Sequence, residues 1–427
     1  MQKLTLRKLD IYTPISKDKR IQNDDFDIDN FLHFPVLIKN DGSIWKHGSL
    51  YLLSKLKKYQ KPSPKTLDSI ASDLKHFKEW CDNEDIDYLS APRKILRPTY
   101  LYRSHLQQLL RDGKISPNTI KRRMSAVVGF YEYLINVEGI KFKFPLWESG
   151  ITSIVYRDNQ GFQYSKQVKT KDVSKVVATS NPDLFDDTIV DGGRLHPLSR
   201  EQQIALVEAL KAIGNIEMTL SFLIALTTGA RIQTVFTLRK KHFEKAIKED
   251  EDEVRIKVGY GTNCDTKFNK LHTLILPTWV YKKVQIYLNS PRYKKREEKA
   301  THIFDEANKQ YIFLTNRGTP FYVAHNDPYR NQYKEVPNGA AVRQFILSSL
   351  KKQLKKEGSY FDFSFHDLRA TFGMNLLDKL MILVDKKELK LSHALIHIKE
   401  RMGHSSLSTT ERYLNNYETF LMELLNG

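Results

Sequence analysis

Two arginines, two histidines and a late tyrosine occur along the chain in an order that could cut a phosphodiester bond. These residues are Arg231, His366, Arg369, His404 and Tyr413. Attack on phosphorus by an oxygen nucleophile adds negative charge to the non-bridging oxygens, and preorganised cations can offset that charge. Arginine suits this task because its planar guanidinium bonds two oxygens and does not titrate near neutral pH. We therefore expect Arg231 and Arg369 to hold a phosphate, with an ordinary surface role as the alternative for each.

The two histidines are candidates to position the phosphate and to exchange protons, because imidazole titrates near neutral pH. His366 lies three residues before Arg369, so the two side chains would share a face on a helix. His404 follows Gly403 and opens a stretch rich in Ser and Thr, which is typical of a helix start. A capping role at that helix start is the structural alternative for His404.

Tyr413, nine residues after His404, is the candidate nucleophile. A phenol is a weak nucleophile at neutral pH because its pKa is near 10. It needs a group that removes its proton and cations that stabilise the electrophile, and the residues above could supply both. The chain has 21 tyrosines, so packing is the usual role of any one of them, and Tyr417 is the nearest rival.

Expulsion of the 5′-oxygen of DNA requires a general acid, and a lysine on a polar loop could serve. Residues 261–270 form such a loop between two predicted strands, and it contains Lys267 and Lys270. We favour Lys267 by its position in the loop, and we leave Lys270 as the alternative. Hydrogen-bond reach of the leaving group is the deciding criterion.

The composition indicates a polyanionic partner. The chain has 427 residues, with 68 Lys+Arg against 50 Asp+Glu and a formal charge of +18. Such an excess favours nucleic acid over a membrane surface or a merely soluble basic protein. Cys81 and Cys264 lie far apart and form neither a metal-ligand cluster nor a disulfide framework. We expect no metal and no cofactor.

The ends and the apolar runs of the chain predict an intracellular protein. The first residues lack the apolar core of a signal peptide. No apolar run approaches the roughly 18 residues that would cross a bilayer. We therefore expect a cytoplasmic, nucleoid-associated protein without a membrane partner.

Periodicity and breakers divide the chain into four predicted parts. Residues 1–60 form an arm or extension, and residues 61–140 a helical domain with apolar residues at helical spacing. Residues 141–195 form a linker rich in breakers. Residues 196–427 form a second domain, which opens with a capping box at Ser199–Gln202. Within it, alternating apolar residues predict strands at 254–260 and 271–277.

A basic triplet in the helical domain is the candidate DNA-binding element. Ser116 and Pro117 signal a helix start, and Lys121, Arg122 and Arg123 follow in the first turns. We expect this triplet to contact backbone phosphates. The C-terminal segment carries an apolar helical face suited to assembly or to packing on its own domain. That face contains Tyr417, Phe420, Leu421, Leu424 and Leu425.

Taken together, these motifs resemble the tyrosine recombinase, or phage integrase, family. The matching pattern is Ala230-Arg231, Lys267, His366-Asp367-Leu368-Arg369, Gly403-His404 and Tyr413. The resemblance implies a mainly α fold with a small β-sheet, built from a helical core-binding domain and an α+β catalytic domain. It implies a homotetramer on double-stranded DNA with specific recombination sites, with possible accessory DNA-bending proteins. It also implies a 3′-phosphotyrosine intermediate formed without ATP or metal.

The chain departs from the family pattern in several places, including longer stretches from Arg231 to His366 and from Arg369 to Gly403, and related activities stay open. The family usually has an acidic residue three positions after the first arginine, whereas this chain has Thr234. A site-specific recombinase or integrase of a mobile genetic element is the leading hypothesis. A type IB topoisomerase-like enzyme or a telomere-resolving enzyme would use the same residues. A catalytically idle DNA-binding factor is the alternative from another class.

Overall fold

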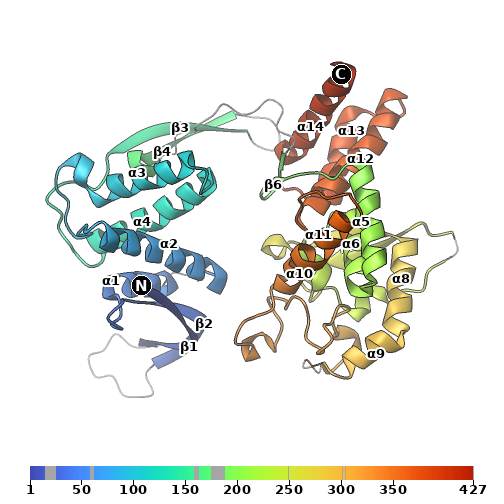
Figure 1. Cartoon of the computed structure of the whole chain (residues 1–427), viewed down its shortest axis with the longest axis horizontal. Coiled ribbons are helices and arrows are strands. Elements are labelled where there is room, and N and C mark those ends of the chain that lie inside the picture. The colour runs from blue at the N-terminus through green and yellow to red at the C-terminus, as the bar shows by residue number, and fades with distance from the viewer. Residues whose placement is uncertain are drawn as a thin grey trace. The chain divides into compact units, whose positions relative to one another are not determined.

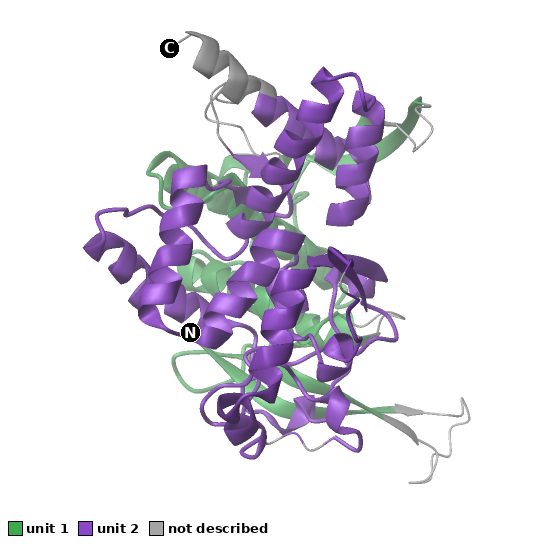
Figure 2. Cartoon of the chain, turned by 90° about the vertical axis from the view of Figure 1, so that its right-hand side faces the viewer, with its two compact units in different colours: residues 1–183 green, residues 184–427 purple. Residues whose placement is uncertain are grey.

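The computed structural model divides into two compact units, Met1–Asp183 and Leu184–Gly427, called unit 1 and unit 2 here (Figure 2). It describes residues 1–14, 26–57, 62–157, 163–174, 188–248, 250–300, 302 and 304–426, with side chains only as far as Tyr417 in the last helix. Helices dominate both units, and the sheets of the described part are antiparallel strand pairs (Figure 1). The predicted fold class, mainly α with a small β-sheet, is confirmed.

Unit 1 joins a bundle of helices to two long strand pairs. Its elements are β1 (Gln2–Pro14), β2 (Phe26–Ile38), α1 (Lys46–Ser54), α2 (Pro64–Asn83), α3 (Pro98–Arg111), α4 (Pro117–Asn136), β3 (Ser149–Arg157) and β4 (Gln163–Lys171). The α4 start follows the predicted signal, because Ser116 Oγ accepts from Thr119 N at 3.3 Å and Pro117 occupies the first turn. Ser63 begins α2 in the same way.

The core of unit 1 extends beyond residues 61–140. Buried side chains from β2, from α1 and from the residue before α1 pack against those of α2 and α4, among them Phe31, Leu37, Trp45 and Leu52. Each has a low exposed fraction because the strand and the short helix cover the bundle. By contrast, β3 and β4 form a ribbon whose described side chains are mostly exposed, within the segment expected to be a linker.

Unit 2 is a larger helical unit with short strand pairs. Its strands are β5 (Ile189–Val190), β6 (Arg194–Leu195), β7 (Glu253–Val258) and β8 (His272–Pro277). Its helices are α5 (Arg200–Ile213), α6 (Ile216–Thr228), α7 (Ile232–Phe236), α8 (Thr278–Asn289), α9 (Pro291–Glu297), α10 (Ala340–Phe345), α11 (Lys351–Lys356), α12 (Asp367–Asp385), α13 (Leu391–Met402) and α14 (Leu407–Asn426).

Local sequence signals account for several of these boundaries. The predicted capping box begins α5, because Ser199 Oγ accepts from Gln202 N and Gln202 Oε1 accepts from Ser199 N. The predicted strands match β7 and β8, although β7 ends at Val258. Gly259 has φ +98°, and a Cβ there would lie 2.2 Å from the Lys270 carbonyl oxygen. The chain must therefore turn at this glycine.

Two hydrophobic clusters hold unit 2 together. The larger one packs α5, α6 and α8 around the β7–β8 pair. The smaller one joins β5 and β6 to α12, α13 and the start of α14, through Ile189, Leu195, Phe372, Met402 and Tyr413. It thereby brings the beginning and the end of unit 2 side by side.

In the described part of the chain, none of the helices combines the length and the apolar character needed to cross a membrane.

Candidate functional site

Four of the six residues proposed for chemistry line one cavity in unit 2, and the other two, His366 and Tyr413, contact Asp191 in its wall. Arg231, Lys267, Arg369 and His404 all line it. They come from the α6–α7 corner, the β7–β8 loop, the start of α12 and the α13–α14 corner. The fold thus brings residues that are far apart in the sequence to the same cavity. Arg231 and His404, for example, are separated by 173 positions.

A glycine corner presents Arg231. Gly229 ends α6 in the left-handed conformation with φ +66°, and Arg231 stands directly before α7. A Cβ on Gly229 would lie 2.6 Å from Cδ1 of Phe372, so a larger residue would both strain the turn and displace the Phe372 ring. The guanidinium of Arg231 keeps partial solvent access and lies 3.4 Å from Asp191 Oδ1.

Arg369 is bound at each of its nitrogens. Its Nε donates to Asp191 Oδ2 at 2.6 Å, its NH1 group to the Gly229 carbonyl at 2.8 Å, and its NH2 group to the Met402 carbonyl at 2.7 Å. Only 3% of the residue is exposed. Because these partners belong to three separate segments, Arg369 fixes the geometry of the cavity as well as its charge.

The two histidines contact one residue, Asp191, in different ways. His366 Nε2 lies 3.0 Å from the Asp191 backbone carbonyl, and His404 Nε2 lies 3.2 Å from its Oδ2 atom. A carbonyl or carboxylate oxygen only accepts, so each Nε2 carries a hydrogen. His404 Nδ1 lies 2.9 Å from the Thr410 hydroxyl. Burial lowers the pKa of both imidazoles, so both are predominantly neutral at neutral pH.

Lys267 and Lys270 both reach the cavity wall, but the position of the Lys267 ammonium group favours Lys267. A Cβ built on Gly192 would lie 3.6 Å from Lys267 Nζ and 3.6 Å from His366 Nε2. The backbone of Phe268 is left-handed, with φ +61°, and its side chain is exposed. The loop therefore turns sharply where Lys267 leaves it.

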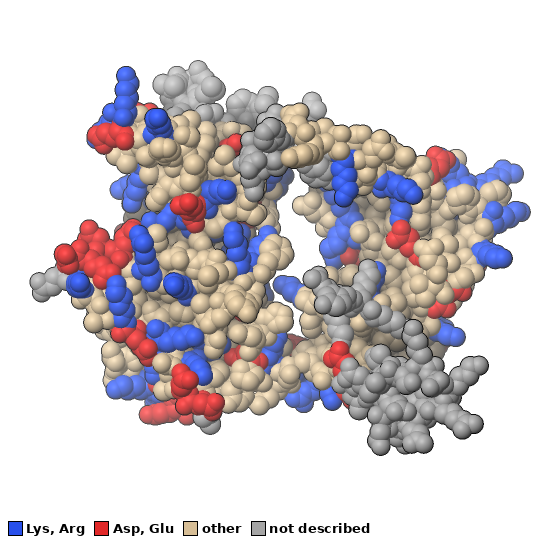
Figure 3. Space-filling model, turned by 180° about the vertical axis from the view of Figure 1, so that it is seen from behind, with Lys and Arg blue, Asp and Glu red and all other residues tan. Residues whose placement is uncertain are grey.

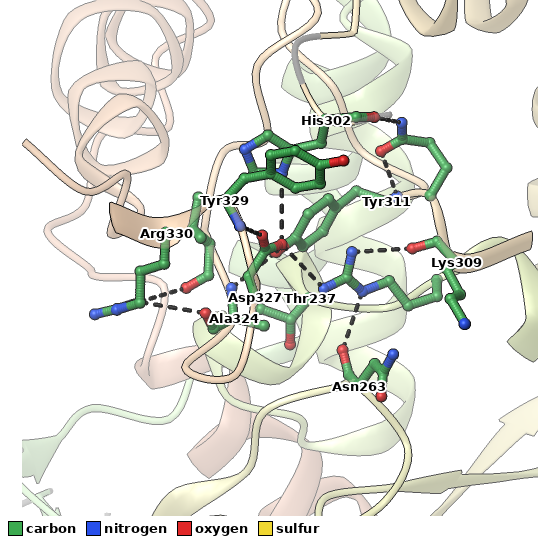
Figure 4. Close-up of polar contacts among 12 residues, drawn as sticks. Thr237, Asn263, His302, Lys309, Tyr311, Ala324, Asp327, Tyr329 and Arg330 are labelled. Carbon is green, nitrogen blue, oxygen red and sulfur yellow. Dashed lines mark hydrogen bonds and ion pairs between the residues drawn. The ribbon is translucent and has the colours of Figure 1, made fainter. Parts of the chain in front are cut away.

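A buried ionic cluster anchors the base of this lysine loop (Figure 4). Arg239 donates to the carbonyls of Asn263 and Lys309 at 3.0 Å each and to Asp327 Oδ2 at 3.4 Å. The Tyr311 ring stacks 3.5 Å from the guanidinium carbon and donates its hydroxyl to Asp327. This cluster is buried and internally bonded, so it supports the loop and has no role in the cavity itself.

Tyr413 is fully buried, and its hydroxyl contacts Asp191, which lines the cavity. The hydroxyl donates to Asp191 Oδ2 at 3.3 Å. The ring packs against Gly373, where a Cβ would lie 2.4 Å from Cε1 of the tyrosine. Burial, and then the charge of Asp191, raises the pKa of Tyr413 well above its usual value. The phenol is therefore held protonated in the DNA-free chain.

Tyr417, the rival nucleophile, lies in a different environment. It is partly buried against the smaller hydrophobic cluster, and the charged groups that act on its hydroxyl are Asp378 and Asp385. Burial, followed by these carboxylates, raises the pKa of Tyr417. The predicted assembly residues Phe420, Leu421, Leu424 and Leu425 lie outside the side chains that the structure describes.

Asp191 is the acidic partner of Arg231 that sequence reasoning missed. Thr234 stands where the acidic residue was expected. It is buried in the cavity wall, and its carbonyl oxygen accepts from Cys264 Sγ at 3.3 Å. Burial acts to raise the pKa of Asp191, but the hydrogen bond from His404 and the charge of Arg369 outweigh it. The pKa of Asp191 is therefore depressed far below its usual value, and the carboxylate is ionised.

Two further residues of the cavity wall were also missed. His272 begins β8 and lies under Gly403, where a Cβ would be 3.2 Å from the imidazole. Arg412, next to the tyrosine, donates to the Val190 carbonyl at 2.7 Å. For Asp191 the sequence signals only a turn, at Gly192-Gly193 just ahead of the capping box, and not the contacts that the turn makes.

The basic triplet on α4 in unit 1 is not uniformly available to a ligand. Lys121 is exposed, but Arg122 lies 2.9 Å from the buried carboxylate of Asp73. Arg123 is largely buried and bonds His76 Nε2 at 2.9 Å. In the view of Figure 3, Lys and Arg side chains are scattered widely over the described surface. Within the triplet, Lys121 is therefore the residue most open to a phosphate.

Two family models match the chain. The model of the phage integrase family matches residues 197–419, and that of the phage integrase N-terminal SAM-like domain matches residues 51–138. A comparison with curated proteins found no match.

Solved structures match most of the chain at low sequence identity. The XerH site-specific recombinase bound to palindromic difH substrate, a post-cleavage complex, is 14% identical with a TM-score of 0.50, over 91% of this chain and 90% of that chain. The Tn1549 transposon integrase with transposon right end DNA is 14% identical with a TM-score of 0.48, over 89% and 99%. A lambda integrase dimer bound to a COC′ core site is 12% identical with a TM-score of 0.47, over 86% and 94%.

Proposed function

The chain belongs to the phage integrase family, the tyrosine-type site-specific recombinases, and on this basis we propose that Tyr413 cuts and rejoins DNA through a covalent intermediate. One observation carries the assignment of roles. The Tyr413 hydroxyl, both arginines and His404 all contact the carboxylate of one residue, Asp191. That carboxylate marks a single anion position that a scissile phosphate can take.

Each candidate side chain has a role at that position. Arg231 and Arg369 stabilise the charge that develops on the non-bridging oxygens. Tyr413 attacks phosphorus and forms a 3′-phosphotyrosine bond, while Lys267 gives a proton to the departing 5′-oxygen. His366 and His404 orient the phosphate and carry protons as the phenol loses its own. Religation reverses these steps with the 5′-hydroxyl of a partner strand.

Double-stranded DNA with specific recombination sites is the proposed partner. The relatives with the same fold are described as bound to difH substrate, transposon end DNA and a core site. We further propose a homotetramer on DNA, held partly by the C-terminal segment, with accessory DNA-bending proteins setting direction. A mobile genetic element is the proposed origin, and association with the nucleoid follows from the DNA partner.

Strand exchange between two labelled duplexes tests the function as a whole. A recombinase yields duplexes of new length that carry label from both parents, and a 3′-phosphotyrosine adduct accumulates when the cut strand is nicked. Relaxation of supercoiled DNA without exchange would instead identify a topoisomerase-like enzyme. A shifted band with neither product would identify a binding factor.

Replacement of Lys267 by alanine is expected to slow cleavage about a hundredfold, because general-acid catalysis commonly contributes that much or more. A substrate whose scissile 5′-oxygen is replaced by sulfur is expected to restore most of the rate. A thiolate is a good leaving group that needs no proton, since thiols have a pKa of about 8.5. The measurement is single-turnover adduct formation on the two substrates.

The matched control is Lys270→Ala, which removes a cation from the same loop and the same cavity wall. For this variant, the ratio of the cleavage rate on the oxygen substrate to that on the sulfur substrate should stay near the wild-type ratio. If Lys270→Ala rather than Lys267→Ala shows rescue by sulfur, the acid is Lys270.

Replacement of Lys121 by alanine is expected to weaken DNA binding and to lower the slope of log K against log salt by about one unit. Arg123→Ala should instead lower the melting temperature, because it removes a largely buried side chain that bonds His76 and lies beside the buried carboxylate of Asp73. Binding titrations at several salt concentrations and thermal melts distinguish the two effects. An unchanged slope for Lys121→Ala would remove this residue from the DNA interface.

A further inference from the structure

The turn between β5 and β6 fills the centre of the candidate site. Asp191 Oδ2 lies 2.6 Å from Arg369 Nε, 3.2 Å from His404 Nε2 and 3.3 Å from the Tyr413 hydroxyl. Its Oδ1 lies 3.4 Å from Arg231, and its backbone carbonyl is 3.0 Å from His366 Nε2. The residue is 4% exposed. One residue therefore engages every candidate catalytic group except Lys267, four of them through its carboxylate and His366 through its backbone carbonyl.

These contacts are those expected of a bound phosphate. A phosphodiester carries one negative charge on two non-bridging oxygens, and a carboxylate presents the same charge on two oxygens in a similar span. Both are suited to the arginine fork. The two anions cannot occupy the position together, because like charges a few ångströms apart repel and would share the same donors.

If Asp191 only supported the two arginines, its contact with the nucleophile Tyr413 would have no explanation. A carboxylate that only held the arginines would approach them from the side away from the reaction. Asp191 Oδ2 instead accepts from the Tyr413 hydroxyl, and that oxygen must face phosphorus for attack. While this hydrogen bond persists, the tyrosine is directed at the carboxylate.

We infer that Asp191 is an internal competitor for the scissile phosphate, which closes the DNA-free site and must leave before Tyr413 can attack. The inference rests on the proposed function, because it assigns the anion position to DNA. It explains how a site with both arginines already in place is prevented from engaging other phosphates.

The local structure allows such a departure. The β5–β6 pair contains only two residue pairs, Ile189↔Leu195 and Val190↔Arg194. Gly192, at φ +76°, and Gly193 form the turn that follows Asp191. Buried Ile189 and Leu195 can keep the strands docked on α12 while the turn rotates. The movement therefore needs a change in a glycine turn and no unfolding of unit 2.

The test compares Asp191→Asn with the wild type in single-turnover cleavage of a nicked duplex site at limiting DNA. Asparagine keeps the shape of the side chain and removes its charge. If the form with Asp191 displaced is a minor species of the wild type, removal of the competing charge makes that form predominant. The cleavage rate at limiting DNA then rises about tenfold or more. Asp250→Asn, an exposed acid in unit 2, is the matched control for the added positive charge.

A rate for Asp191→Asn equal to that of Asp250→Asn, or a loss of cleavage with an unchanged melting temperature, would overturn the inference. If the variant does not fold, the structure of the wild-type DNA complex decides the question. An Asp191 Oδ2 still bonded to Arg369 Nε in that complex contradicts displacement, and a separated pair supports it. Absence of any adduct from the wild type would instead count against the proposed function.

Discussion

Replacement of Tyr413 by phenylalanine is expected to abolish the covalent protein–DNA adduct while leaving DNA binding intact. The substitution removes only the hydroxyl, which makes one hydrogen bond, to Asp191. The ring stays packed against Gly373 and Met402 in the smaller hydrophobic cluster. Without the nucleophilic oxygen no phosphotyrosine can form. Denaturing gels of a labelled nicked site measure the adduct, and a mobility-shift titration measures binding.

Tyr417→Phe is the matched control, since it removes a phenol one helical turn away on α14. It should form the adduct at near the wild-type rate, because its hydroxyl lies among acidic groups outside the arginine pair. The reverse outcome, with the adduct lost in Tyr417→Phe and kept in Tyr413→Phe, would falsify the assignment of the nucleophile.

Loss of either arginine is the second large effect. Arg231→Ala and Arg369→Ala are each expected to slow adduct formation about a thousandfold, the usual scale for removal of one donor to a developing oxyanion. The conservative lysine variants should recover little, because an ammonium group cannot reproduce the planar fork. The measurement is the single-turnover rate at saturating DNA.

The two arginine variants should differ in stability. Arg369 is buried and bonds Gly229, Met402 and Asp191, so its loss leaves buried acceptors without donors and lowers the melting temperature. Arg231 is partly exposed and makes a single long contact, so Arg231→Ala should melt near the wild type. Arg255→Ala, on the exposed face of β7, controls for loss of a cation. Near-wild-type cleavage by Arg231→Ala would contradict its role.

The sequence was sufficient to find the candidate residues because their types and order are distinctive. Few kinds of site combine arginines, imidazoles and a phenol. The nine-residue spacing places His404 just before the start of α14 and Tyr413 in its second turn. Sequence alone could not show that they meet. Their meeting depends on the corner at Gly229, on the packing of Phe372 against it and on the Gly373–Tyr413 contact.

Asp191 could not be predicted because its role depends on long-range contacts. It stands 40 residues before Arg231 and 178 before Arg369, in a stretch that composition marked only as a linker. Local rules identify its glycine turn but not where that turn docks. The buried pairing of Arg123 was missed for the same reason, since Asp73 and His76 belong to a different helix.

Fold prediction was most accurate where local chemistry sets an element boundary. The Ser116 cap and the Ser199–Gln202 box begin α4 and α5 where they were predicted. The β1–β2 pair was not predicted, because both strands carry charged residues among the apolar ones. Their pairing depends on cross-strand contacts that the periodicity of a single strand does not reveal.

The most direct test of the central claim is to identify the residue that is bonded to DNA. The wild-type protein would be trapped on a nicked site, denatured and digested, and the peptide that carries nucleotide would be sequenced by mass spectrometry. The account predicts a 3′-phosphate ester on the hydroxyl of Tyr413. Nucleotide attached to Tyr417 or to any other residue, or complexes that never carry an attached strand, would contradict it.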